Sequence, residues 1–190
     1  LQEIRSELIG LERTMPIEPT LVDLGGGCFN MGSIKGDVDA AVDEELHEVC
    51  IEGFQIGIFE VTFDEFDRYS NLKNKQLIDD RGWGRETKPV INVSYMEAID
   101  YAKWLSLQTG HNYRLPTESE WEYAARGGQE TIFPWGNRVG RNRANCRNCR
   151  SALGGKETTP VGSFEPNGYG IHDMVGNVAE RTCSLYRASY

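Results

Sequence analysis

Residues 113–128 read Tyr113-Arg-Leu-Pro-Thr-Glu-Ser-Glu-Trp-Glu-Tyr-Ala-Ala-Arg-Gly-Gly128, which is a short helix with its start and stop signals in place. Thr117 and Glu120 have the T-x-x-E spacing of a capping box, in which each side chain covers a backbone N–H of the first turn. Trp121 and Ala125 lie one turn apart, so we expect them to share one buried face. The two closing glycines supply the left-handed ending that a side chain would resist.

A second informative run is Pro160-Val-Gly-Ser-Phe-Glu-Pro-Asn-Gly-Tyr-Gly-Ile-His-Asp-Met-Val-Gly-Asn-Val178. Shorter motifs surround the two runs: Gly26-Gly-Cys-Phe-Asn-Met-Gly32, Glu60-Val-Thr62, Pro89-Val-Ile-Asn-Val-Ser94, Phe133-Pro-Trp-Gly136 and Ala144-Asn145. Taken together, these motifs resemble the formylglycine-generating enzyme family, also called sulfatase-modifying factors, over residues 22–185. The resemblance implies an α+β, C-type-lectin-like fold with two main helices, short strands and long irregular loops.

Length and composition are those of one ordinary domain of 190 residues, 39% hydrophobic and 26% charged. No apolar run approaches the roughly 20 residues that a membrane helix needs, so we expect no membrane association. The net charge of −9 argues against nucleic acid as a partner, because phosphate binding depends on cations. We divide the chain into residues 1–14, an amphipathic helix and linker, and residues 15–190, a formylglycine-generating-enzyme-like domain that stops short of the family's C-terminal segment.

Further elements follow from local patterns. Capping boxes at Thr62 and Ser94 predict a short helix to about residue 69 and the longest helix, which ends at Gly110. We predict a strand over residues 21–31, broken by three glycines, and another over residues 54–58, where apolar and other residues alternate. The acidic segment 37–48 is expected to be a solvated loop, with cation binding as the lesser alternative.

The five cysteines leave at least one unpaired. Cys28 and Cys50 fall in separate predicted strands and are interpreted as adjacent core residues, since free cysteine packs as a small hydrophobe. Cys146 and Cys149 form one C-x-x-C pair, which is weak evidence for zinc without further ligands. A loop disulfide or two free thiols is the expected state of that pair.

Calcium is the cofactor that the resemblance implies. Family members hold calcium through a carboxamide or carboxylate, backbone carbonyls and a glutamate in the segment that matches residues 173–180. Carried over, the ligands are Asp173, the carbonyls of Gly176 and Val178, and Glu180, with a second site beginning at Asn145. A bound cation would fix the long loops by taking their oxygen atoms. The alternative is that Asp173 and Glu180 only form hydrogen bonds within the loop.

Catalysis in the family rests on a pair of copper-binding cysteines beyond the region that this chain contains, and thiolate suits that soft metal. None of the five cysteines occupies a matching position, and Ala179 and Arg181 stand where the family has two tryptophans. Some relatives use iron, but His47, His111 and His172 lack the spacing of an iron-binding triad. We therefore assign no catalytic residue in these 190 residues.

These observations favour a calcium-stabilised binding or regulatory module that recognises a protein or peptide ligand, or adjoining domains of a larger chain. One version is the variable protein of a diversity-generating retroelement, with which the atypical segment 179–190 is compatible. The rival hypothesis is a truncated copper- or iron-dependent oxidoreductase that oxidises a protein cysteine or a small thiol. Five arginines between Arg138 and Arg150 form either a solvated loop or a contact patch for an acidic peptide, a phosphate or another domain.

Overall fold

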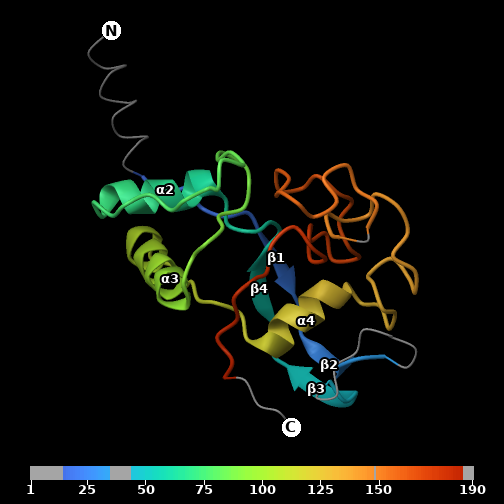
Figure 1. The fold of residues 1–190 in the computed structure, drawn as a ribbon. Coiled ribbons are helices and arrows are strands. Elements are labelled where there is room, and N and C mark those ends of the chain that lie inside the picture. The colour runs from blue at the N-terminus through green and yellow to red at the C-terminus, as the bar shows by residue number, and fades with distance from the viewer. Residues whose placement is uncertain (1–14, 35–43, 148, 186–190) are drawn as a thin grey trace, which may run out of the picture.

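The computed structural model describes residues 15–34, 44–147 and 149–185 (Figure 1). Its regular elements are β1 (Leu21–Leu24), β2 (Gly27–Met31), β3 (His47–Ile51), β4 (Phe54–Gly57), α2 (Phe63–Leu72), α3 (Tyr95–Thr109) and α4 (Glu118–Arg126). Long loops make up most of the remainder, so the α+β architecture expected from the sequence is confirmed. The amphipathic helix predicted over residues 1–14 lies outside the described residues.

The predicted strand over residues 21–31 is two strands in two different sheets. β1 pairs antiparallel with β4, aligning Leu21 with Gly57, and β2 pairs antiparallel with β3, aligning Gly27 with Ile51. Gly26 separates them with φ of +70°, and a Cβ on it would lie 2.5 Å from the Ile51 carbonyl oxygen. Only glycine fits this turn, which redirects the chain from one sheet to the other.

Each of the three described helices begins with a complete capping box, as the sequence predicted. Thr62, Ser94 and Thr117 are the N-caps, and in each case the side chain of the glutamate three residues later returns to the cap backbone. α2 continues to Leu72, a few residues beyond the predicted end. Gly110 and Gly127 close α3 and α4 in the left-handed conformation.

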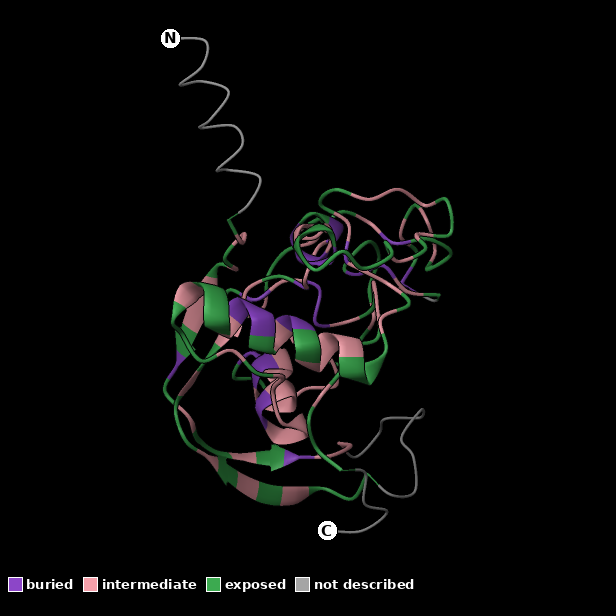
Figure 2. Cartoon of the chain, turned by 90° about the vertical axis from the view of Figure 1, so that its left-hand side faces the viewer, coloured by how far each residue is buried: buried purple, intermediate pink, exposed green. Residues whose placement is uncertain are grey.

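Two apolar clusters hold the fold together. Figure 2 shows in purple where the chain is buried, including stretches of the helices. The helical cluster joins α2 to α3 through Phe66, Tyr69, Tyr101, Trp104 and Leu105. The sheet cluster packs α4 and the late loops against β1 through Leu24, Ala124, Ile171 and Met174, with Trp121 partly buried at its margin. Burying these faces is what makes such short helices stable.

The cysteines differ from one of our expectations. Cys28 and Cys50 are cross-strand neighbours of β2 and β3, but both are exposed and joined by a disulfide, so they are not core residues. Cys146 and Cys149 also form a disulfide, and Cys183 is an exposed free thiol. Residues 37–43 of the acidic segment lie outside the described residues, and its last two residues, His47 and Glu48, belong to β3 and not to a loop. None of the described helices is long and apolar enough to cross a membrane.

Candidate functional site

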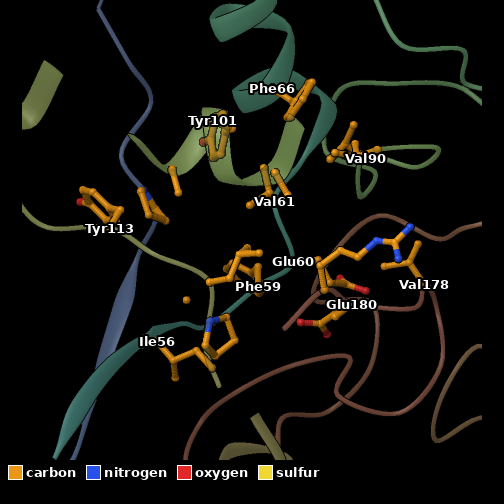
Figure 3. A pocket seen from close by; sticks show the side chains of 18 of the residues that line it. Ile56, Phe59, Glu60, Val61, Phe66, Val90, Tyr101, Tyr113, Val178 and Glu180 are labelled. Carbon is orange, nitrogen blue, oxygen red and sulfur yellow. The ribbon is translucent and has the colours of Figure 1, made fainter. Parts of the chain in front are cut away.

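Three acidic side chains form one cluster beside a large hollow, and two of them, Glu60 and Glu180, line it. Glu60 comes from the segment between β4 and α2, while Asp173 and Glu180 come from the loop that ends the described chain. Figure 3 shows the side chains of Glu60 and Glu180 next to each other there. The charges of Asp173 and Glu180 both act on Glu60, which places the three groups in one electrostatic cluster.

Hydrogen bonds and backbone conformation hold the segments that carry these side chains in place. Glu60 is followed by Val61, whose carbonyl accepts a hydrogen bond from Val90 N at 2.8 Å, and then by the N-cap of α2. Asp173 takes a left-handed backbone, with φ of 56°, and its Oδ2 accepts a hydrogen bond from Gly162 N at 2.6 Å. Asn177, also left-handed, donates from its side chain to Glu60 Oε2 at 3.4 Å.

Burial and mutual repulsion shift the acids toward their neutral forms. The pKa of Glu60 is raised to about 9, mainly by burial and then by the negative charges of Asp173 and Glu180. The hydrogen bond from Asn177 acts in the opposite direction and lowers this pKa. Burial also raises the pKa of Asp173. The Glu180 side chain is partly accessible to solvent, but the surrounding protein in the hollow removes much of its hydration. This desolvation raises the pKa of Glu180 to about 6, whereas its contact with the Trp121 N–H lowers the pKa.

Two oxygens of this cluster are buried without a hydrogen-bond partner, Glu60 Oε1 and Asp173 Oδ1. An unpaired buried oxygen costs about 1–3 kcal/mol, and more when it is charged. A hard cation would satisfy both oxygens, and calcium takes six to eight oxygen ligands from carboxylates and carbonyls. Among the described residues, no three His, Cys, Asp or Glu side chains are arranged to hold an ion by themselves, so backbone carbonyls must complete such a site.

Glu60 is the member that sequence reasoning missed. It stood in the Glu60-Val-Thr62 motif, to which we gave no role beyond its part in the family resemblance. Its position immediately before a capping box was visible in the sequence. Its approach to the loop of Asp173 and Glu180 was not, because that contact joins segments far apart in the chain.

Asn145 is buried in a separate, fully hydrogen-bonded setting. Its side-chain oxygen accepts hydrogen bonds from Gly155 N at 3.0 Å and Ser151 Oγ at 3.3 Å, and its amide donates to Glu157 O at 2.7 Å. The Asn145 carbonyl accepts a hydrogen bond from Asn177 N at 2.9 Å. Asn145 therefore connects its own loop to the acidic cluster through protein contacts.

The three histidines lie in different settings. His172 stacks on Phe59 with ring centroids 5.0 Å apart, and its Nδ1 lies 2.8 Å from the Phe164 carbonyl oxygen. His111 makes an edge contact with Tyr113, and His47 lies at the start of β3. The structure thus places the histidines on separate elements.

The hollow beside the acidic cluster measures about 1440 Å³ (Figure 3). β4, one face of α3 and the loop carrying Val178 to Arg181 line it. Aliphatic and aromatic residues make up much of its lining, and Glu60 and Glu180 are among the charged residues there. A site of this kind can bind a ligand by apolar contact and orient it with a few polar groups.

Relatives of the chain include both active and inactive enzymes by name. The chain is 44% identical to the formylglycine-generating enzyme of Mycobacterium tuberculosis, over 87% of this chain and 74% of that enzyme. It is 31% identical to the inactive C-alpha-formylglycine-generating enzyme 2 of Bos taurus, over 89% of this chain and 72% of that protein. It is also 31% identical to a serine/threonine-protein kinase of Chlamydia pneumoniae, over 88% of this chain but only 28% of the kinase.

Solved structures share the fold. PvdO from Pseudomonas aeruginosa superimposes with a TM-score of 0.79 at 32% identity, covering 90% of this chain and 73% of PvdO. The variable protein 1 of Treponema denticola gives a TM-score of 0.68 at 22% identity, covering 87% of this chain and 73% of that protein. The family model for the sulfatase-modifying factor enzyme 1-like domain matches residues 9–190. The chain therefore belongs to the formylglycine-generating enzyme, or sulfatase-modifying factor, family.

Proposed function

We propose that these residues form a calcium-stabilised binding module. Calcium would be held by the two buried carboxylates, Glu60 and Asp173, and by the backbone carbonyls of Gly176 and Val178, and Glu180 would move onto the ion to complete the site. The observation that carries the proposal is the pair of buried, unpartnered oxygens, Glu60 Oε1 and Asp173 Oδ1, within one acidic cluster. The second calcium site, which would begin at Asn145, stays a prediction of the family resemblance; in the structure the Asn145 side chain binds Gly155 N and Glu157 O.

Calcium at this position would join two parts of the chain that otherwise repel each other. Glu60 belongs to the segment that leads into the helical cluster, and Asp173 and Glu180 belong to the irregular loops. The cation would favour the ionised acids and restore their usual titration range. Since an ion bound only to the folded state stabilises it by mass action, its affinity would add directly to folding stability.

Thermal unfolding with calcium and with a chelator tests this proposal. We expect saturating calcium to raise the melting temperature by several degrees, on the order of 2–4 kcal/mol at calcium concentrations far above Kd. Glu60→Gln and Asp173→Asn should remove most of that increase. Glu52→Gln is the matched control, since Glu52 is an exposed glutamate in the turn between β3 and β4. Identical melting curves in calcium and chelator would contradict the proposal.

The cysteines favour binding over oxidation as the role of these residues. Copper chemistry of the family's kind needs two thiolates. Four of the cysteines in this chain are held in the Cys28–Cys50 and Cys146–Cys149 disulfides, which leaves Cys183 as the thiol within the described residues. The names of the relatives do not decide the matter, because both an active and an inactive enzyme are similar to this chain.

Oxidation of a protein cysteine or small thiol is the second candidate function, for a protein that contains these residues together with the family's copper-binding cysteine pair. The 44% identity to the mycobacterial formylglycine-generating enzyme favours it. The test is to supply the protein, as its gene encodes it, with copper, oxygen, a reductant and a cysteine peptide, and to measure the mass of the peptide. Formylglycine formation in the peptide would establish this activity, and an unchanged peptide mass would contradict it.

A retroelement-diversified variable protein is the finer form of the binding proposal. The fold shared with Treponema denticola variable protein 1 is compatible with it, although 22% identity speaks for the fold alone. Sequencing the gene from several isolates tests this form. Substitutions concentrated at adenine-containing codons near residues 179–190 would support it, and an even distribution would contradict it.

A further inference from the structure

The irregular chain after α4 carries a concentrated positive charge. Residues 131–156 contain five arginines, one lysine and no acid, which gives this segment a charge of +6. The whole chain carries −9, so all the other residues together carry −15. The segment lies among the loops drawn in orange on one side of the molecule in Figure 1. We call its five arginines the arginine patch: Arg138, Arg141, Arg143, Arg147 and Arg150.

A cross-linked backbone presents the arginine patch. Asn142 N donates a hydrogen bond to Cys149 O at 3.0 Å, which places residues 141–143 beside Arg150. Cys149 is in turn joined to Cys146 by a disulfide and by a backbone hydrogen bond of 3.2 Å. Asn142 and Arg150 both have a left-handed backbone, with φ of 53° and 54°. A partner would therefore not have to order this part of the chain on binding, and that ordering is a main cost of association.

The arginines of the patch differ from the arginines elsewhere in their partners. All five are exposed, and within the described residues none of their side chains forms a hydrogen bond or an ion pair. Five arginines elsewhere in the chain do bond a side chain or carbonyl: Arg68, Arg81, Arg85, Arg114 and Arg126. Clustered like charges repel one another, so an anionic partner would relieve the repulsion within the patch.

A pair of aromatic rings borders the patch. Phe133 and Trp135 stack with ring centroids 5.3 Å apart and planes 4° from parallel, and both residues are half-buried. Trp135 Nε1 donates to Arg138 O at 3.0 Å, which holds the indole beside the first arginine. Trp135 and Arg143 also line one small recess together with Glu165, but no ion pair found among the described residues joins Arg143 to Glu165. Arginine and aromatic side chains are the types enriched where proteins bind one another.

We propose that the arginine patch binds a short acidic segment of another protein. Aspartate and glutamate carboxylates of that segment would pair with the guanidinium groups, whose planar forks bond both carboxylate oxygens. Its apolar side chains would contact Phe133 and Trp135.

The charge of the remaining chain favours a short segment over nucleic acid or an anionic bilayer. A long polyanion or a bilayer would extend past the patch and meet residues that together carry −15. This inference rests on the binding role proposed above and names the chemistry of the partner. It does not require bound calcium, because a disulfide and backbone hydrogen bonds hold the patch.

Titration calorimetry on the 190-residue protein, in calcium and in chelator, tests the inference. The probes are short blocked peptides in which glutamate and aspartate alternate with leucine or tyrosine. Control peptides carry glutamine and asparagine in place of the acids. We expect the acidic peptides to bind and the amide peptides to bind at least about tenfold more weakly, because the amides cannot form ion pairs. Added salt should weaken binding, since it screens exposed charges.

Variants of the patch locate the binding site. The double variant Arg141→Gln, Arg147→Gln removes two exposed guanidinium groups and should weaken binding of the acidic peptides by about tenfold or more. The matched control is the double variant Lys73→Gln, Lys103→Gln, which removes two exposed positive charges at the end of α2 and on α3 and should bind normally. Melting curves confirm that both variants are folded, and the amide peptides test the unsubstituted protein without any variant.

Three results would overturn the inference: no binding by any acidic peptide, equal binding of the amide peptides, or unchanged binding by the arginine double variant. Tighter binding of a single-stranded oligonucleotide or of vesicles containing anionic lipid would also overturn it and assign the patch to those anions. Self-association in sedimentation that the arginine double variant abolishes would assign the patch to a second copy of the chain.

The calcium proposal can fail separately. Binding of acidic peptides by a protein whose melting curve ignores calcium would support the arginine patch and contradict the calcium site. Calcium stabilisation without peptide binding would do the reverse.

Discussion

The two halves of the molecule are stabilised in different ways. The α2–α3 half has two regular helices, two complete capping boxes and a cluster of aromatic rings, with Tyr69 in contact with Phe66, Tyr101 and Trp104. The half after residue 127 has almost no regular structure and is held by side-chain to backbone hydrogen bonds, a disulfide and left-handed residues. The comparison teaches that apolar packing is enough to stabilise helices that have one apolar face. Irregular backbone has no such face, so its stability depends on hydrogen-bond partners or on a cation.

The largest effect is expected in the helical half. Trp104 is 4% exposed and packs against Tyr69 and Tyr101. Trp104→Ala should cost roughly 3–5 kcal/mol of unfolding free energy, because it leaves a cavity in an aromatic cluster. Urea unfolding measures the loss in calcium and in chelator. A cost that appears only in chelator would show that the two halves are not stabilised independently.

Removal of calcium should destabilise the loops after residue 127. Hydrogen exchange with and without chelator should show lost protection in residues 158–180, while α2 and α3 keep theirs. The reason is that Asp173 and its loop gain their missing partner from the cation, and the size of the effect is about 2–4 kcal/mol at saturating calcium. Equal loss of protection in both halves would contradict the division.

The free energy of unfolding should depend on pH through Glu60 in the acidic cluster. Without calcium, Glu60 has a pKa of about 9 in the folded protein and 4.5 in the unfolded chain. The folded state therefore binds more protons, so this contribution is fully present below pH 4.5 and is lost as pH rises through about 9. Chelator-treated protein should lose stability on alkalinisation, measured by urea unfolding at several pH values.

Two controls sharpen the pH experiment. Glu60→Gln should flatten the dependence, because an amide does not titrate in this range. Saturating calcium should also abolish the alkaline loss, since the cation favours the ionised carboxylates. A dependence unchanged in Glu60→Gln would place the titrating group elsewhere.

The smallest effect is expected at the N-cap of α4, a helix that lies outside both the α2–α3 half and the loops after residue 127. Thr117 Oγ1 accepts a hydrogen bond from Glu120 N at 3.2 Å at the start of α4. Thr117→Ala should cost about 1 kcal/mol, measured by urea unfolding, whether or not calcium is present. Thr117→Ser restores the hydroxyl and should recover most of the loss. A calcium-dependent cost would mean that α4 belongs energetically to the loop half.

The helices of this protein were predictable from local sequence. A capping box joins residues three apart, so Thr62, Ser94 and Thr117 identified the start of each described helix without knowledge of the rest. Asp173, Gly176, Val178 and Glu180 were candidates from the family motif, and the structure places both acids in one cluster with Glu60. Calcium itself stays a prediction.

Long-range proximity was decided by the tertiary structure. Asn177 reaches Glu60 across 117 residues, and nothing local to either residue indicates that contact. The exposed Cys28–Cys50 disulfide and the division of residues 21–31 between two sheets depend on strand pairing, which the alternation of one strand does not specify. Local hydrogen bonds and side-chain periodicity depend on residues that are close in sequence, so the sequence predicts them. The acidic cluster and the hollow form only where segments distant in the sequence pack together.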